Sequence, residues 1–296
     1  MKVTSVCAFL LVVCGVAVSA NRPKITGIDH VGFYTTSPAA NANFYAHVLG
    51  LASADPLEPG QSQRYIVGIQ WVGYSPAPTP TSSNRMDHIA LRTDDCEALR
   101  AYLAERGIKV PASLTHWNDG SLSFVVDDPE GHKIEFVQVK GHIQMTVEDG
   151  ISRHMIHAGF VVRDRPAEDH FYKDILGFHL YWQGGMTADR NDWVAMQVPD
   201  GTDWLEYMLN IKPDADIHTI GVMDHISLGV KDIKQAQAKL ESHGWKSNNR
   251  EHAQMGRDGK WQLNVYDPDF TRVELMEFTP AQKPCCSEFT GPHPSE

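Results

Sequence analysis

Two side chains able to ligate a metal ion stand in otherwise apolar sequence at either end of residues 156–210. His157 lies near the start of the strand-like run 156–162, and Glu206 interrupts the similar run 204–209. Burying an imidazole or a carboxylate costs free energy unless a partner satisfies it. The stretch therefore predicts a buried polar site held by strands.

The residues between them predict a unit that recurs along the chain. Residues 167–178 have helical spacing and end around Gly177, which suits the left-handed turn that closes a helix. The order of a strand with a histidine near its start, a helix, and two or three further strands occurs four times. The opening strands lie at 28–31, 86–91, 156–160 and 223–228. The chain is predicted to be an α+β protein of four units.

Shared helix and turn sequences show that units one and two correspond to units three and four. Phe44-Tyr45 before Leu49-Gly50 matches Phe171-Tyr172 before Leu176-Gly177, and the amphipathic helix 98–107 matches 236–244. Units two and four each end in an Asp-Pro turn and a strand with a central glutamate, at 128–136 and 267–275. Phe270 replaces the turn glycine Gly131 and suits a left-handed conformation poorly, so we expect a reshaped turn there.

On these repeated positions the chain resembles a tandem member of the vicinal oxygen chelate (VOC) superfamily. This group includes glyoxalase I, type I extradiol dioxygenases, methylmalonyl-CoA epimerase and the bleomycin and fosfomycin resistance proteins. The resemblance covers about residues 25–280. It implies four βαβββ modules paired into two cups of curled mixed sheet with flanking helices, a first domain at 25–140 and a second at 152–280. In catalytic members a cup holds a divalent metal ion.

In the second cup the resemblance places the ligands of the glyoxalase I type on two histidines and two glutamates. They are His157, Glu206, His225 and Glu274. Two neutral imidazoles and two carboxylates balance a divalent charge and leave open coordination positions. Strand alternation excludes His154 and Glu277, because each is an odd number of residues from a ligand and points to the opposite face.

In the first cup the resemblance matches only His30, His88 and Glu135. The strand that closes its first unit, taken as 64–71, offers no carboxylate in place of Glu206. Two histidines with one carboxylate make the facial triad of ferrous oxygenases, or the remainder of a second, vestigial metal site. The extradiol pattern also expects a tyrosine where this chain has Val125 and Asn264, which counts against ring cleavage.

Charge and the N-terminal residues bear on partners and location. The net charge is −11 and no run of Lys and Arg occurs, which argues against a nucleic-acid partner. Residues 1–20 have the pattern of a signal peptide: a basic start, an apolar core too short to span a bilayer, and a small-residue cleavage site before Asn21. We therefore expect a periplasmic or secreted protein that does not associate with a membrane after cleavage.

The cysteines do not form a disulfide framework. After signal cleavage an odd number remains: Cys96 at a predicted helix start, where a small buried side chain is expected, and the adjacent Cys285 and Cys286. These two lie in the Pro-containing tail 281–296, which we expect to be an unpacked end able to cross-link or to bind metal adventitiously. The remaining histidines, His132 among them, have no spacing that indicates a role and are predicted at the surface or in loops.

Together these features favour a metalloenzyme acting on a small-molecule substrate, with its working site in the second cup. Zn, Ni or Co would bind two vicinal substrate oxygens and stabilise an enediolate, while Glu206 or Glu274 moves the proton as general base. Two alternatives stay open: an Fe(II) extradiol-type dioxygenase, and a non-catalytic protein that sequesters a ligand. The tryptophans of the second half either line a pocket or pack in the core. A homo-oligomer is compatible with the sequence but is not required.

Overall fold

The computed structural model describes residues 21–57, 61–79, 85–141 and 150–296, so the expected signal peptide lies outside the described residues. The first half contains β1 (Ile25–Thr35), α1 (Pro38–Ala42), η1 (Asn43–Val48), β2 (Ser53–Ala54), β3 (Gln63–Val67), β4 (Gln70–Pro76), β5 (Met86–Thr93), α2 (Cys96–Glu105), β6 (Thr115–His116), β7 (Leu122–Asp127) and β8 (Lys133–Gln138). The second half contains β9 (Met155–Val161), α3 (Arg165–Glu168), η2 (Asp169–Ile175), β10 (His179–Gly184), β11 (Trp193–Gln197), β12 (Trp204–Met208), α4 (Ile217–Met223), β13 (His225–Val230), α5 (Ile233–Ser242), β14 (Gln254–Met255), β15 (Trp261–Tyr266) and β16 (Arg272–Glu277).

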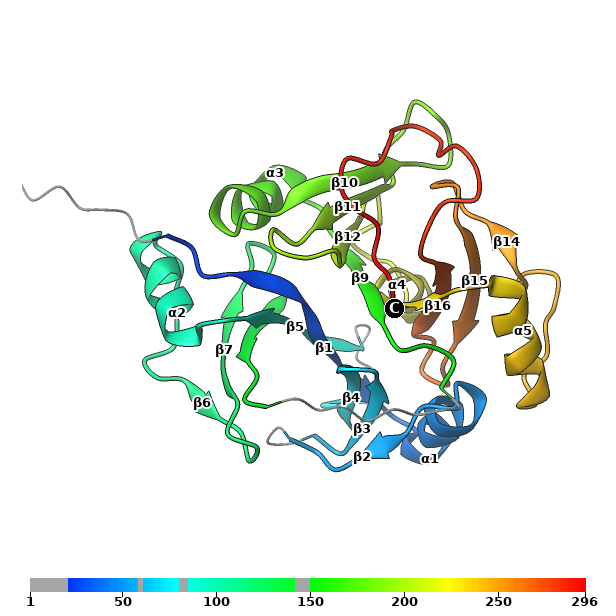
Figure 1. Cartoon of the computed structure of the whole chain (residues 1–296), viewed down its shortest axis with the longest axis horizontal. Coiled ribbons are helices and arrows are strands. Elements are labelled where there is room, and N and C mark those ends of the chain that lie inside the picture. The colour runs from blue at the N-terminus through cyan, green and yellow to red at the C-terminus, as the bar shows by residue number, and fades with distance from the viewer. Residues whose placement is uncertain (1–20, 58–60, 80–84, 142–149) are drawn as a thin grey trace, which may run out of the picture.

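The strands form two curled mixed sheets with the same topology (Figure 1). Each has eight strands, in the orders β2-β3-β4-β1-β5-β8-β7-β6 and β10-β11-β12-β9-β13-β16-β15-β14. In both sheets two four-stranded modules meet at a central antiparallel pair, β1 with β5 and β9 with β13. The strand that closes each module runs parallel to its opening strand, as β12 does beside β9. The α+β fold of four βαβββ modules is confirmed.

Strand alternation divides each sheet into a face packed on helices and a face that lines the cup. On β8, Ile134 and Phe136 belong to the main hydrophobic core, whereas Glu135 between them points into the cup. Helix α2 covers that core with its apolar stripe, and its N-cap is Asp95, whose side chain accepts a hydrogen bond from the backbone N–H of Ala98. The cup face is therefore the part of each sheet that is available to hold polar ligands.

The two halves interlock through their Asp-Pro turns. Asp128 Oδ2, in the first half, accepts a hydrogen bond from Tyr172 of the second half at 3.1 Å. In the related position Asp267 Oδ2, in the second half, accepts one at 3.1 Å from Tyr74 of the first half. All four side chains are nearly or fully buried. Each half therefore donates a hydrogen bond to the turn carboxylate of the other half.

The Asp-Pro turn of the fourth module keeps the shape of its counterpart. Phe270 has φ of 70° and Gly131 has φ of 88°, and both donate the same backbone hydrogen bond to the turn aspartate, at 3.1 Å. The expectation of a reshaped turn is therefore wrong. The left-handed conformation costs a bulky residue about 1 kcal/mol or more, which the fixed ends of the turn outweigh.

The C-terminal tail is packed, contrary to the expectation of an unpacked end. Figure 1 shows it running beside β10, where the backbone N–H of Thr290 donates to Tyr181 O at 3.0 Å. Ser287 Oγ accepts from Gln183 N and donates to Gln183 O, each at 3.0 Å. Cys285 and Cys286 form a disulfide with each other. A Pro-containing segment without periodicity has little structure of its own, so this order comes from β10.

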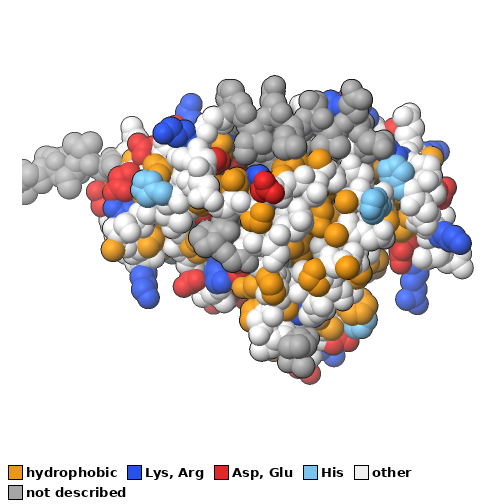
Figure 2. Space-filling view, turned by 90° about the horizontal axis from the view of Figure 1, so that it is seen from below, with side chains coloured by type: hydrophobic (Ala, Val, Ile, Leu, Met, Phe, Trp, Pro, Cys, Tyr) orange, Lys and Arg blue, Asp and Glu red, His pale blue; other side chains and the backbone are white. Residues whose placement is uncertain are grey.

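Cys96 is the other cysteine in the described residues, and it is buried as expected. On the face shown in Figure 2, Lys and Arg side chains stand apart and form no continuous basic surface. Among the described residues no helix has the length and apolar character to cross a membrane.

Candidate metal centres in the two cups

The second cup brings all four predicted ligand side chains together on its inner face. His157 Nε2 lies 3.1 Å from His225 Nε2 and 3.3 Å from Glu274 Oε2. Glu206 Oε2 lies 3.5 Å from His225 Nε2 and 3.9 Å from His157 Nε2. Neighbouring ligands at about 2.1 Å from one octahedral ion are about 3 Å apart. The three closer atoms approach this spacing, and Glu206 lies slightly outside it.

Burial sets the protonation of this group. It lowers the pKa of both His157 and His225, so both rings are neutral, which is the form that ligates metal. Burial and the carboxylate of Glu274 raise the pKa of Glu206 to about 8. Burial alone would raise the pKa of Glu274 too, but the hydrogen bond from His157 and the positive charge of Arg272 bring it below its ordinary value. The two carboxylates thus differ in how readily they hold a proton.

The second cup also contains a cation that the sequence analysis missed. His225 Nδ1 donates to Met223 O at 2.7 Å, so Nε2 carries a lone pair. Arg272 Nη2 donates to that nitrogen at 2.7 Å, and Nη1 lies 4.0 Å from Glu274 Oε1. His157 Nδ1 has no hydrogen-bond partner among the described residues. The donor set fits a divalent ion, provided that the Arg272 guanidinium moves off His225.

Two glycines make room for the histidine rings. A Cβ atom on Gly159 would lie 2.0 Å from Cε1 of His225, and one on Gly32 would lie 2.3 Å from Cε1 of His88. Real Cβ contacts are never this short, so any side chain at either glycine would displace the ring. The sequence analysis did not single them out. The signal was present as His-x-Gly-Phe, which occurs at 30–33 and again at 157–160.

The first cup brings together His30, His88 and Glu135. His30 Nε2 lies 2.9 Å from His88 Nε2 and 3.4 Å from Glu135 Oε2, and His88 Nε2 lies 3.7 Å from the same oxygen. Arg92 pairs with Asp29 Oδ2 at 2.7 Å. The first cup thus holds a three-residue set with the spacing of one shared ion.

The outer contacts of this triad fit a metal ion as well. His30 Nδ1 lies 2.9 Å from Asp29 Oδ1, and His88 Nδ1 lies 3.1 Å from Asp87 Oδ2. A carboxylate accepts hydrogen bonds, so each Nδ1 carries the hydrogen and each Nε2 a lone pair. Two lone pairs 2.9 Å apart repel each other unless a cation or a proton lies between them. These Nδ1 contacts therefore suit a first cup that binds a divalent ion through both Nε2 atoms.

The position that corresponds to Glu206 in the first cup is Gly73. The closing strand of the first module is β4, at Gln70–Pro76, and not 64–71 as the sequence suggested. Trp71 lies beside His30 on β4 as Trp204 lies beside His157 on β12, so Gly73 takes the place of Glu206. Residues 64–71 include the turn before β4. The prediction therefore placed the closing strand too early in the chain, on the preceding strand of the hairpin. The prediction that no carboxylate occupies this position is nevertheless correct, because the residue is a glycine.

A cavity of about 90 Å³ borders the ligand atoms of the second cup. Its polar wall includes Glu206, Glu274 and Arg272, and its other wall is aromatic, formed by Tyr181, Trp182, Trp193, Trp204 and Phe289. Three of the five tryptophans of the second half thus line the cavity, while Trp245 and Trp261 pack against the core. A small molecule in this cavity would meet carboxylates and rings together.

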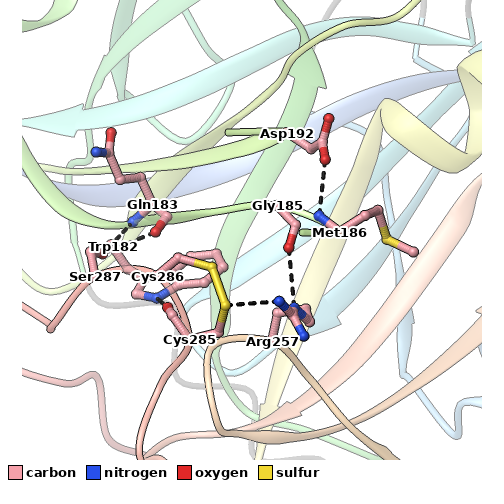
Figure 3. Close-up of a disulfide and its surroundings, with 9 residues drawn as sticks. All are labelled: Trp182, Gln183, Gly185, Met186, Asp192, Arg257, Cys285, Cys286 and Ser287. Atoms are coloured by element: carbon pink, nitrogen blue, oxygen red, sulfur yellow. Dashed lines mark hydrogen bonds between the residues drawn. A yellow bond between two sulfur atoms is a disulfide. The ribbon is translucent and has the colours of Figure 1, made fainter. Parts of the chain in front are cut away.

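The tail closes one side of this cavity. Figure 3 shows Cys285 and Cys286 beside Trp182, whose indole N–H donates to Cys285 O at 3.1 Å. Arg257, another cavity residue, lies 2.9 Å from the Cys285 sulfur and donates to Gly185 O at 3.1 Å. Phe289 of the tail is itself part of the aromatic wall. The tail that sequence reasoning treated as unpacked is thus part of the candidate site.

Beneath the aromatic wall lies Lys260, which is completely buried. Its Nζ lies 4.6 Å from the ring centroid of Trp204 and donates to Tyr181 Oη at 3.3 Å. Burial lowers the pKa of this lysine to about 8, although Asp258 opposes the shift. In addition to Arg257, the second cup therefore holds the cationic side chains of Lys260 and Arg272, and the sequence analysis indicated none of the three.

The cavity of the first cup is larger but does not border the ligand atoms. It measures about 470 Å³ and is lined by residues that include Asp29, Arg92, Trp71 and Trp117. Trp71 stacks flat on His30, with ring centroids 3.7 Å apart, and so screens this histidine from the cavity. A molecule in this cavity would meet Trp71 before it met the triad.

The two residues excluded by strand alternation lie away from the site. His154 Nε2 contacts Asp203 Oδ1 at 2.7 Å, and Glu277 accepts a hydrogen bond from the backbone N–H of Ile233 at 3.0 Å. Asn264 and Val125 occupy positions opposite Glu274 and Glu135 in their sheets, so no tyrosine stands there in either cup.

Comparisons with known proteins agree with this architecture. No curated protein matches the chain. Homoprotocatechuate 2,3-dioxygenase from Brevibacterium fuscum, with 3,4-dihydroxyphenylacetate bound, superposes with a TM-score of 0.64 at 19% identity, over 88% of this chain and 82% of that one. The enzyme from Arthrobacter globiformis gives 0.65 at 18% identity, over 88% and 81%. The 2,3-dioxygenase LapB from Pseudomonas sp. KL28 gives 0.65 at 15% identity, over 93% and 96%. Likeness at these identities shows a shared fold.

The sequence itself also matches a family model, twice. The model describes the Glyoxalase/Bleomycin resistance protein/Dioxygenase superfamily and matches residues 27–136 and 154–275, one match for each cup. Together with the two histidine–carboxylate sets, the family implies a divalent metal ion and a small-molecule substrate. The chain belongs to the Glyoxalase/Bleomycin resistance protein/Dioxygenase superfamily.

Proposed function

We propose that the protein is a metal-dependent enzyme that moves a proton on a small oxygen-chelating substrate in its second cup. One observation carries the proposal: Glu206 and Glu274 belong both to the four-residue ligand set and to the wall of a cavity. A molecule in that cavity can reach the ion and a carboxylate together. The reaction is of the glyoxalase kind, an isomerisation or a lyase step.

The two glutamates have distinct parts in this proposal. A divalent ion, when bound, polarises two vicinal substrate oxygens and makes the adjacent C–H more acidic. Burial and the charge of Glu274 raise the pKa of Glu206, so this carboxylate is the one that takes up the proton. Glu274, whose pKa is lowered, stays ionised and balances positive charge. Lys260 is too deeply buried to meet substrate directly, but its charge favours a negatively charged intermediate.

The cavity limits the class of substrate. The cavity is small, at about 90 Å³, and suits a compact substrate. Aromatic rings on one wall favour a flat or apolar group, and Arg257 and Arg272 on the other favour negative charge. We therefore infer that the substrate is a compact hydroxycarbonyl or dicarbonyl compound. We also infer that the protein binds this substrate after export.

The test compares one carboxylate from each cup. Glu206→Gln keeps the volume of the side chain and removes its charge, so the affinity for Zn²⁺ or Ni²⁺ should fall tenfold or more, together with any isomerase activity. Glu135→Gln is the matched control and should do much less. Each variant is stripped with chelator, titrated with Zn²⁺, Ni²⁺ and Fe²⁺, and checked for unchanged melting without metal. Loss of metal binding only in Glu135→Gln would show that the active site lies in the first cup.

A second candidate function is Fe²⁺-dependent dioxygenation at the first cup. The observation that favours it is the triad of two histidines and one glutamate with carboxylates on both Nδ1 atoms. Such triads with open positions serve ferrous oxygenases, and the solved structures compared above are dioxygenases. Oxygen uptake with a catechol and Fe²⁺, lost in Glu135→Gln and kept in Glu206→Gln, would establish this function instead.

A further inference from the structure

A third group of ligand-type side chains lies outside both cups, where the halves of the chain meet. Asp128 and His132 come from the Asp-Pro turn of the first half, and Glu168 comes from the last turn of α3 in the second half. Each offers a ligand atom, and the three atoms lie within 4.8 Å of one another. Sequence spacing gave His132 no role. It lies in the loop before β8 as expected, but its ring packs edge-on against Phe160 with centroids 4.8 Å apart.

The Asp128 carboxylate is fixed in place by its neighbours. Its Oδ1 accepts backbone hydrogen bonds from Glu130 at 3.0 Å and His132 at 2.8 Å. Its Oδ2 lies 2.8 Å from His132 Nδ1 and accepts a hydrogen bond from the Tyr172 hydroxyl at 3.1 Å. The aspartate, the imidazole and the phenol thus share one oxygen at the centre of the group.

Glu168 is the unexplained member. Its side chain is completely buried, and Oε1 accepts one hydrogen bond, from the backbone N–H of Glu130 at 3.1 Å. Oε2 has no hydrogen-bond partner among the described residues. A buried carboxylate oxygen without a donor costs free energy, so the position needs either a cation or a proton.

The repeat shows that the turn does not require these groups. At the equivalent junction Asp267 takes the part of Asp128, and its Oδ1 accepts backbone hydrogen bonds from Asp269 at 2.8 Å and Thr271 at 2.9 Å. There Asn41 stands three residues before the Phe-Tyr pair where Glu168 stands in the second half, and Thr271 stands where His132 does. One junction is neutral at these two positions and the other carries an extra carboxylate and an imidazole. Glu168 and His132 are therefore additions to a turn that folds without them.

We propose that Asp128, His132 and Glu168 bind a divalent first-row metal ion at the junction between the two cups. Two carboxylates and an imidazole form an N/O donor set suited to Zn²⁺ or Mn²⁺. Asp128 and His132 are on one half and Glu168 on the other, so the ion joins the halves. A cavity of about 220 Å³, lined by His132, Arg163 and Asp224 among others, opens beside His132 and gives the ion a path from solvent.

The competing explanation is a proton shared between two carboxyl groups. Burial and the charges of Asp128 and Glu130 raise the pKa of Glu168 to about 9, so without a cation this side chain is protonated at neutral pH. Gln is nearly isosteric with a protonated glutamic acid. Glu168→Gln therefore separates the two cases. It preserves the size and neutral charge of a protonated glutamic acid, but it removes the carboxylate that would bind a metal ion.

The experiment uses full-length protein in which the cups are silenced by His88→Gln and His225→Gln. We expect this protein, stripped with chelator, to bind one Zn²⁺ or Mn²⁺ ion and to melt at a higher temperature with the ion than without it. Adding Glu168→Gln should lower the affinity tenfold or more and abolish the metal-dependent rise in melting temperature. Adding Asp267→Asn, the control at the equivalent junction, should lower the melting temperature but leave the affinity unchanged.

Two results overturn the proposal. One is a silenced protein that binds no ion, and the other is a Glu168→Gln variant that binds as the silenced parent does. Either result would show that Glu168 is a protonated carboxylic acid and not a metal ligand. If the silenced protein fails to fold, crystals of the unaltered protein soaked in MnCl₂ decide the question. Anomalous scattering among the three side chains supports the site, and its absence there while the cups show scattering rejects it.

Discussion

Arg272 Nη2 lies 2.7 Å from His225 Nε2, on the nitrogen that this histidine would offer to a metal ion. The guanidinium and the ion therefore compete for one lone pair. The first cup has no such competition from the equivalent residue, Lys133, which is half exposed and pairs with Asp87 at 2.7 Å. The two cups thus differ in what an ion must displace.

Removing the competing cation should strengthen metal binding in the second cup. Arg272→Met keeps the apolar length of the side chain and removes the guanidinium, so we expect Zn²⁺ affinity to rise about tenfold in a chelator-competition assay. Lys133→Met, at the equivalent register position, should change the affinity of the first cup far less. Weaker Zn²⁺ binding in Arg272→Met would show that the arginine supports the site.

A methyl group at Gly159 should disable the second cup. The added Cβ would lie 2.0 Å from the His225 ring, which must then turn away. We expect metal affinity to fall tenfold or more and the free energy of unfolding to drop by about 1–3 kcal/mol. Gly150→Ala is the control, because its nearest neighbour would lie at 3.4 Å. Calorimetric metal titration and urea unfolding measure both effects, and unchanged affinity in Gly159→Ala would contradict the placement of His225.

The His154–Asp203 pair should make stability depend on pH. Burial lowers the pKa of His154, but the hydrogen bond and charge of Asp203 outweigh it and the net pKa lies above 6.5. The folded state then binds more protons than the unfolded state, so this stabilisation is complete below pH 6.5 and is lost as pH rises through the folded pKa. In urea unfolding at several pH values, the stability difference between the parent and His154→Gln should shrink with rising pH. A difference independent of pH would refute this.

Export is a prediction from the first twenty residues alone. If they act as a signal peptide, mass spectrometry of the native protein should find its N-terminus at Asn21. Soluble cytoplasmic protein with Met1 intact would rule this out.

The fold could be predicted from the sequence because four units repeat one pattern. A histidine at the start of each opening strand, Phe-Tyr before Leu-Gly in units one and three, and Asp-Pro before the closing strand in units two and four recur at matching distances. Each is imposed locally, by burial, by a helix end or by a turn. The family resemblance built on this repeat implies the ligands His157, Glu206, His225 and Glu274, and the structure brings their ligand atoms together.

The cations of the second cup were missed although alternation could have located one. Arg272 is two residues before Glu274 on β16, so both must face the cup once Glu274 does. Charged residues at strand starts are usually solvated, so the charge of Arg272 by itself indicated no role. Lys260 gave no such signal. Its position depends on the aromatic rings around it, which come from β10, β12 and the tail.

The tail has a consequence for the behaviour of the protein at high concentration. Three of the four strands at the edges of the two sheets, β2, β6 and β14, contain two residues each, whereas β10 contains six. β10 is thus the one edge among the described strands long enough to recruit a strand from another molecule. Hydrogen bonds from Ser287 and Thr290 occupy part of it. By covering part of β10, the last residues of the chain oppose aggregation. A chain shortened at this end would expose the edge of β10 to pairing with a strand of another molecule.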